Sequence, residues 1–164
     1  GALTGELKRI ASEAGSAARA HIIRAVPAAE LLEWTQGATA GIVPYEDKML
    51  NHWIATPNKL WEYPGAGVPL IVQPFPEMRR IVETYRCGWI LPREFTPEAI
   101  AGLVASLTDD MIAEARAGCR DFVAHDNWST YETRLLDLYD TLARQIAAER
   151  TPAGAALSPA RAAV

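Results

Sequence analysis

The sequence lacks long apolar runs and clusters of basic residues. No stretch approaches the ~20 consecutive apolar residues that a helix needs to cross a bilayer, and the first residues do not combine a basic region with an apolar one. No run of Lys and Arg is dense enough to neutralise a row of phosphates, and 16 basic against 20 acidic residues give a net charge of -4. These absences predict a cytoplasmic protein with no nucleic acid among its partners, and they leave attachment to a membrane surface open.

Cysteines and metal-ligand clusters are equally scarce. Cys87 and Cys119 fall on separate predicted elements, with neither metal-site spacing nor the density of a disulfide scaffold, so we expect two free, buried thiols. Glu46 and Asp47 stand beside Lys48 without further ligands, which favours a solvated turn over a metal pair. We therefore expect no metal and no cofactor.

The composition is that of an ordinary globular domain. Hydrophobic residues make up 49% of the chain and charged residues 22%. A chain of 164 residues is long enough for one core. We expect one domain over residues 1–150 and a flexible Ala/Pro/Gly-rich tail over residues 151–164.

Short apolar runs alternate with stretches of helical periodicity. The runs predict strands at 20–23, 38–43, 68–72 and 88–91. Helices are expected to begin near Leu3, Pro27, Pro57, Pro76, Thr96, Met111 and, from a capping box, Ser129. Parallel strands need a crossover, and a helix is the usual one, so the fold class predicted is α/β, with a Rossmann-like parallel sheet flanked by helices.

In an open parallel sheet the ligand crevice lies at the carboxyl ends of the strands. That rule points to the loops after Ile23, Val43 and Val72, and the longest covers residues 45–56. His52 lies in this loop, where solvent exposure is the commoner outcome and a functional role the alternative. His21 is expected to be packed within its strand, and His125 to end a helix.

The helix after this loop begins with charged and polar residues. Pro57 at its first position leaves the amides of Asn58, Lys59 and Leu60 unpaired, which suits a diphosphate, and Lys59 adds a positive charge. Glu62 shares a face with Asn58 and could accept hydrogen bonds from the two hydroxyls of a ribose. A surface ion pair between Lys59 and Glu62, without further role, remains the alternative.

The segment 56–72, TPNKLWEYPGAGVPLIV, resembles the signature of glycosyltransferases related to glycogen synthase (glycosyl transferases group 1), which share the GT-B fold. Their pattern is P-N-K-L-x-E-Y, then A-G-x-P and a strand. The likeness extends to GELK at 5–8, VPAAEL at 26–31, GWIL at 88–91 and TPEA at 96–99, and it covers about residues 1–145. It implies the C-terminal, donor-binding half of such an enzyme.

The resemblance also implies roles for individual residues. Glu62 matches the ribose-binding glutamate, and the diphosphate would lie against Asn58, Lys59 and Leu60. The donor sugar would face Tyr45 and the loop through Asn51 to Thr56, and the base would lie against Arg24 and Val26. The implied activity is metal-independent transfer of a hexose from a UDP- or GDP-linked sugar to an acceptor hydroxyl, in polysaccharide or glycoconjugate biosynthesis. No catalytic residue is identified.

Two departures from the family pattern bear on this activity. Many relatives carry an earlier glutamate, in E-x7-E, at the position of Ile54, so that contact with the donor sugar is missing here. The family's first strands, with their Arg/Lys pair, have no counterpart before Gly1, nor has the acceptor-binding domain. We therefore expect a domain truncated at its N-terminus, inactive alone, which needs a partner chain or self-associates through an open sheet edge. The alternatives are a non-catalytic binding or scaffold module and a GT-B nucleotide-sugar epimerase, for which no acid/base residues stand out.

Overall fold

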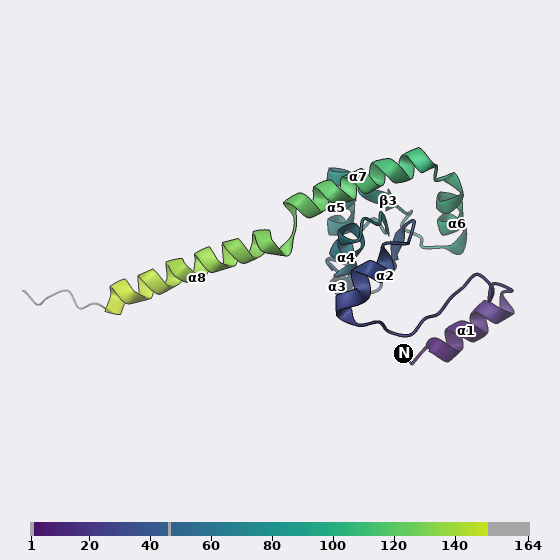
Figure 1. Cartoon of the computed structure of the whole chain (residues 1–164), viewed down its shortest axis with the longest axis horizontal. Coiled ribbons are helices and arrows are strands. Elements are labelled where there is room, and N and C mark those ends of the chain that lie inside the picture. The colour runs from purple at the N-terminus through teal and green to yellow at the C-terminus, as the bar shows by residue number, and fades with distance from the viewer. Residues whose placement is uncertain (1, 46, 151–164) are drawn as a thin grey trace, which may run out of the picture.

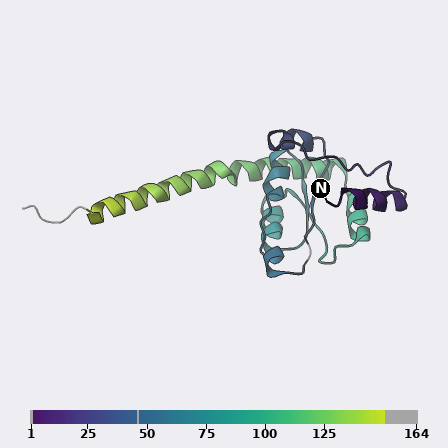
Figure 2. The same ribbon diagram turned by 90° about the horizontal axis from the view of Figure 1, so that it is seen from below.

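The computed structural model describes residues 2–45 and 47–150, with side chains up to Glu149. In chain order the elements are α1 (Thr4–Glu13), the 3-10 turn η1 (Ala28–Glu30), α2 (Leu31–Thr35), β1 (Gly41–Val43), α3 (Leu50–Trp53), α4 (Lys59–Gly65), β2 (Leu70–Val72), α5 (Pro76–Tyr85), β3 (Gly88–Ile90), α6 (Pro97–Ser106), α7 (Asp109–His125) and α8 (Trp128–Arg150). Two views show α8 extending away from the body of the domain, with α1 at the opposite end (Figures 1 and 2). Within the described ranges no helix has the length and apolar character needed to cross a bilayer.

The described strands form one three-stranded parallel sheet in the order β1-β2-β3. Ile71 of β2 pairs with Ile42 on one side and with Trp89 on the other. All three residues of β2 are buried, so both faces of the central strand are covered, as a parallel sheet requires. The α/β class with a parallel sheet flanked by helices, predicted from the alternation of patterns, is confirmed.

Two crossover helices cover the sheet. α4 connects β1 to β2, and α5 connects β2 to β3. Right-handed crossovers that step in the same direction place both helices on one face of the sheet. The core forms where Leu60 of α4 and Met78 and Ile81 of α5 meet the buried strand residues Val43, Leu70 and Val72.

Helix α7 packs across α4 and α5. The ring of Phe122 lies 6.1 Å from the ring of Trp61 on α4 and 5.0 Å from the ring of Tyr85 on α5, measured between centroids. Cys87 and Cys119 are buried in this region as free thiols, which confirms the sequence prediction.

The segment before η1 differs from the prediction. Residues 20–27 adopt no regular structure, His21 is exposed and Ile23 is 62% exposed. The backbone N–H of Ala20 donates to Ser16 at 2.9 Å, which ties the run to the end of α1. An apolar run signals burial, but a strand also needs a neighbour with which to bond, and in the described residues this run has none. The predicted strand at 20–23 and the packed His21 are therefore wrong.

Helix α6 begins as predicted but packs less closely. The Thr96 hydroxyl accepts from the backbone N–H of Ala99 at 3.1 Å, which confirms the N-cap. The apolar periodicity of α6 predicts a buried stripe, but the residues of that stripe are half-buried or exposed, and Val104 is 51% exposed; they are Ile100, Leu103, Val104 and Leu107. The reason is a hollow of about 440 Å³ that Leu103 lines together with Trp89 of β3, so the helix stands off the sheet edge.

The start of α8 also differs from the prediction. Asn127, two residues before Ser129, accepts from the backbone N–H of Thr130 through its side-chain oxygen at 3.1 Å. Its amide nitrogen donates to the Val123 carbonyl of α7 at 2.9 Å. Ser129 therefore lies inside the helix, and the capping box at Ser129 is wrong, because an asparagine that bonds both helix ends replaces it.

Candidate functional site

A hollow of about 400 Å³ lies at the carboxyl ends of the three parallel strands. The segments that follow β1, β2 and β3 supply its lining residues, which are Pro44, Tyr45, Asp47, Gln73, Arg93 and Phe95. Open parallel sheets bind ligands at this position because the loops after neighbouring strands converge there. Of the residues assigned to the donor from the sequence, Tyr45 lies in this hollow.

Two polar side chains that sequence reasoning missed organise the hollow. Gln73, directly after β2, is 2% exposed, and its Oε1 accepts from the backbone N–H of Tyr45 at 2.6 Å. Arg93 pairs with Asp47 at 2.6 Å and lies over the ring of Trp53, 5.1 Å from its centroid. The sequence did hold a signal for Gln73, since a polar residue directly after a buried parallel strand lies at the ligand edge.

The long loop after β1 is held by aromatic contacts. It contains α3, and Tyr45 lies edge-to-face against His52 with 5.4 Å between the ring centroids. His52 is half-buried by this contact, whereas Asn51 and Thr56 are exposed. The loop is therefore packed at Tyr45 and His52, while Asn51 and Thr56 face solvent. Glu46 lies outside the described residues.

Lys59 and Glu62 meet on the surface of α4. The Lys59 ammonium forms an ion pair with the Glu62 carboxylate and lies 5.9 Å from the centroid of the Tyr63 ring. The Lys59 side chain is 44% exposed and the Glu62 side chain 27%, so a ligand can reach both. This contact is the surface ion pair left as the alternative, and a pair so exposed contributes about 0–1 kcal/mol to stability. A nucleotide that uses both groups would have to separate them.

The first turn of α4 is more closed than the sequence suggested. The Leu60 N–H donates to the Pro57 carbonyl at 2.9 Å, so the prediction that this amide is unpaired is wrong. Asn58 already has helical backbone angles (φ -51°, ψ -29°), and turn bonds therefore begin before the helix proper. The amides of Asn58 and Lys59 have no backbone acceptor in the part of the chain that the structure describes. The Leu60 side chain is fully buried and contributes to the core.

Arg24 and Val26, assigned to the base, lie in a separate hollow. Its volume is about 400 Å³, and its lining residues are Ile23, Arg24, Ala25, Val26, Pro27, Glu30 and Trp34. It shares no lining residue with the hollow at the strand ends. The structure thus divides the predicted site residues among three places, which are this hollow, the strand-end hollow and its loop, and the exposed start of α4, and it buries Leu60 in the core.

The remaining titratable candidates form no further centre. His125 lies in the last turn of α7 beside Asp121, with 3.1 Å between Nδ1 and the carboxylate, as expected for a histidine at a helix end. Burial raises the pKa of Cys87 to about 11 and that of Cys119 to about 12, so neither thiol is an activated nucleophile. Over residues 2–45 and 47–150 no three His, Cys, Asp or Glu side chains gather as a metal ion would require.

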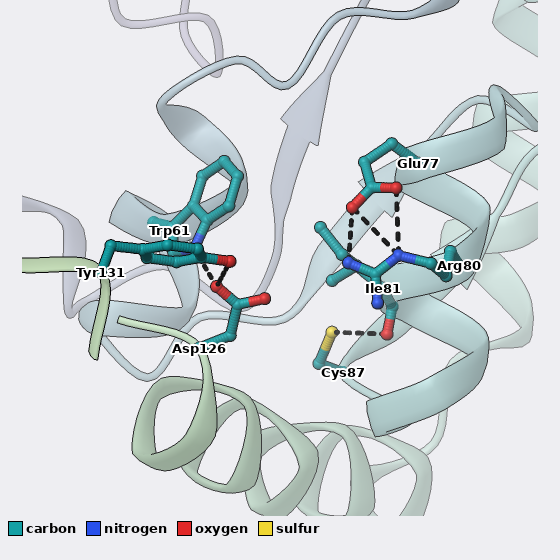
Figure 3. A network of polar contacts seen from close by, with 7 residues as sticks. All are labelled: Trp61, Glu77, Arg80, Ile81, Cys87, Asp126 and Tyr131. Carbon is teal, nitrogen blue, oxygen red and sulfur yellow. Dashed lines mark hydrogen bonds and ion pairs between the residues drawn. The ribbon is translucent and has the colours of Figure 1, made fainter. Parts of the chain in front are cut away.

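One carboxylate outside these hollows is buried and accepts two hydrogen bonds. Asp126 is 8% exposed and accepts from the indole N–H of Trp61 at 3.2 Å and from the Tyr131 hydroxyl at 3.0 Å (Figure 3). The hydrogen bond to Asp126 raises the pKa of Tyr131. Nearby on α5, the Arg80 guanidinium lowers the pKa of Glu77 through a bidentate contact (Figure 3). Because Trp61 adjoins Glu62, the Asp126 contact bears on the candidate site.

Comparison with protein families, with curated proteins and with solved structures gives no match to this chain.

Proposed function

We propose that this chain binds a nucleoside-diphosphate sugar and serves as the donor-binding half of a GT-B glycosyltransferase. The observation that carries the proposal is the accessible Lys59–Glu62 pair on α4, the helix of the crossover that follows β1. It stands in a segment that resembles the donor-binding signature of glycosyltransferases related to glycogen synthase. The charges suit the ligand, because an ammonium matches a diphosphate and a carboxylate matches a ribose diol.

The chemistry asked of this half is positioning and charge stabilisation. Lys59 would hold the leaving diphosphate and stabilise its negative charge, while Glu62 would fix the ribose through its hydroxyls. The strand-end hollow, with Tyr45 and the Asp47–Arg93 pair at its rim, would lie against the donor sugar. Arg24 and Val26 would lie against the base. The acceptor hydroxyl would come from a second domain or a partner chain, and no catalytic base is assigned to this half.

Calorimetric titration of UDP and GDP into the chain and its Glu62→Ala variant tests the proposal. Loss of the contact with the ribose hydroxyls should weaken binding by about 1.5 to 3 kcal/mol, the range for hydrogen bonds to charged groups. Glu83→Ala is the control, because Glu83 also forms a helical ion pair, with Arg79 on α5, although its side chain is 56% exposed and that of Glu62 is 27% exposed. Absence of binding by the wild-type chain, or equal affinities for wild type and Glu62→Ala, would refute the role of Glu62. A collapse of the melting temperature in Glu62→Ala alone would make the residue structural.

A further inference from the structure

The carboxylate of Asp126 lies where three helices meet. Asp126 follows α7 directly and precedes Asn127, the residue that caps α8. Its Oδ1 accepts one hydrogen bond from Trp61 of α4, at 3.2 Å, and one from Tyr131 of α8, at 3.0 Å. Figure 3 shows both donors directed at the same carboxylate. A single oxygen atom therefore joins α4 to α8.

Helix α4 depends on such contacts for its orientation. It is seven residues long, contains Pro64 and has no side-chain cap, and helices this short are not stable on their own. Leu60 anchors it in the core, and Trp61 holds it against α7 through Phe122 and Asp126. The rotation of α4 about its axis, and with it the direction of Lys59 and Glu62, is set by these neighbouring residues.

Helix α8 meets the domain at the same carboxylate. From Tyr131 to Glu149 every side chain of α8 is exposed, including Leu135, Leu138, Leu142 and Ile146 along one stripe. The side-chain hydrogen bonds of Thr133, Thr141 and Arg144 stay within the helix, whereas that of Tyr131 reaches Asp126. A change in the direction of α8 would move the Tyr131 hydroxyl and so alter the bonding of a carboxylate that Trp61 shares.

We propose that Asp126 is a positioning residue for Lys59 and Glu62, and that through it the direction of α8 acts on nucleotide affinity. The inference rests on the proposed function for its effect on binding. Its structural part, the control of α4 by Asp126 and Tyr131, stands without that function. Asp126 touches no substrate and acts through Trp61.

Hydrogen–deuterium exchange of α4 in the full chain tests the structural part. In Asp126→Ala the amides of α4 exchange faster than in wild type, Asp126→Asn restores protection because its amide oxygen still accepts, and Tyr131→Phe gives an intermediate rate. Asp121→Ala, an exposed carboxylate one turn earlier on α7, is the control and leaves α4 unchanged. Unchanged exchange of α4 in both Asp126→Ala and Tyr131→Phe overturns the proposal. If Asp126→Ala fails to fold, Trp61→Phe, which removes the N–H but keeps a ring, replaces it under the same criterion.

Calorimetric titration with UDP and GDP tests the effect on binding. Asp126→Ala weakens affinity by about tenfold, equal to about 1.4 kcal/mol, and Tyr131→Phe by about threefold, at unchanged melting temperature for Tyr131→Phe. Asp126→Asn binds within about twofold of wild type. If all three variants bind UDP and GDP with the affinity of wild type, the link between Asp126 and the nucleotide is overturned. A wild-type chain that binds neither nucleotide refutes the proposed function instead, and the exchange data then decide the role of Asp126 by themselves.

Discussion

Gly118 of α7 lies so close to Tyr85 that a Cβ atom on Gly118 would be 2.2 Å from the Tyr85 carbonyl oxygen. The obstacle is backbone, so no side-chain rotation relieves it, and the contact is where α7 packs on the end of α5. Gly118→Ala should therefore lower the free energy of unfolding by about 1–3 kcal/mol, the range for overpacking a tight core. Urea unfolding monitored by circular dichroism measures it.

Gly102 of α6 supplies the matched control for that substitution. It is also a helical glycine, but a Cβ atom there meets nothing within 4 Å. Gly102→Ala should stabilise the chain by up to about 1 kcal/mol, because alanine is the better helix former. Equal effects of the two substitutions would show that α7 does not pack on α5 as described.

The two thiols should be protected from reaction in the native state. Burial raises the pKa of Cys87 from 9.0 to about 11 and that of Cys119 to about 12, so almost no thiolate exists at pH 8. The neutral thiols contribute stability below pH 9, and this contribution is lost as the pH rises toward 11 and 12. We expect a disulfide reagent to label neither cysteine at pH 8 in the native chain and both in denaturant. Rapid labelling of the native chain would contradict the burial.

Asn127 should matter to α8, and Ser129 should not. Asn127 accepts from the N–H of Thr130 and donates to Val123, so Asn127→Ala removes a cap and the link between α7 and α8. We expect a loss of about 1 kcal/mol, typical of an N-cap, and faster amide exchange in the first turn of α8. Ser129→Ala is the control, and an effect as large as that of Asn127→Ala would restore the capping box predicted from sequence.

Local patterns account for the parts of the fold that were predicted correctly. The run 68–72 contains β2, since a fully buried parallel strand reads as continuous apolar sequence, and Thr96 caps α6 through its own side chain. The run at 20–23 has the same composition as a strand but lacks a neighbouring strand with which to pair, a property no local pattern records. Likewise, asparagine and serine are both common N-cap residues, so the sequence permits a cap at Asn127 or at Ser129. Asn127 is the cap because its side chain also bonds the Val123 carbonyl of α7, a contact that depends on where α7 ends.

In the candidate site, too, the contact between residues close in sequence was predicted and the contacts between distant residues were not. The Lys59–Glu62 contact follows from helical spacing and was predicted as an alternative. The bond between Gln73 and the backbone of Tyr45 joins residues 28 positions apart, and the bond between Trp61 and Asp126 spans 65 positions. Contacts at such separation depend on how β1, β2 and α7 are assembled, so the sequence alone could not name the partners.

Lys59→Ala should distinguish a diphosphate site from a structural ion pair. The Lys59 ammonium is proposed to meet phosphate, so its loss should weaken binding of UDP or GDP by about 1.5 to 3 kcal/mol and change affinity for uridine or guanosine by less than about threefold. Removal of Lys59 also leaves the Glu62 carboxylate without its ion-pair partner, which makes a drop in nucleoside affinity still less expected. Added salt should narrow the difference between wild type and variant, because it screens an exposed charge. Arg79→Ala, which breaks the comparable Arg79–Glu83 pair, is the control and should change neither affinity. Equal losses for diphosphate and nucleoside would mean that Lys59 supports the shape of α4 and does not contact phosphate.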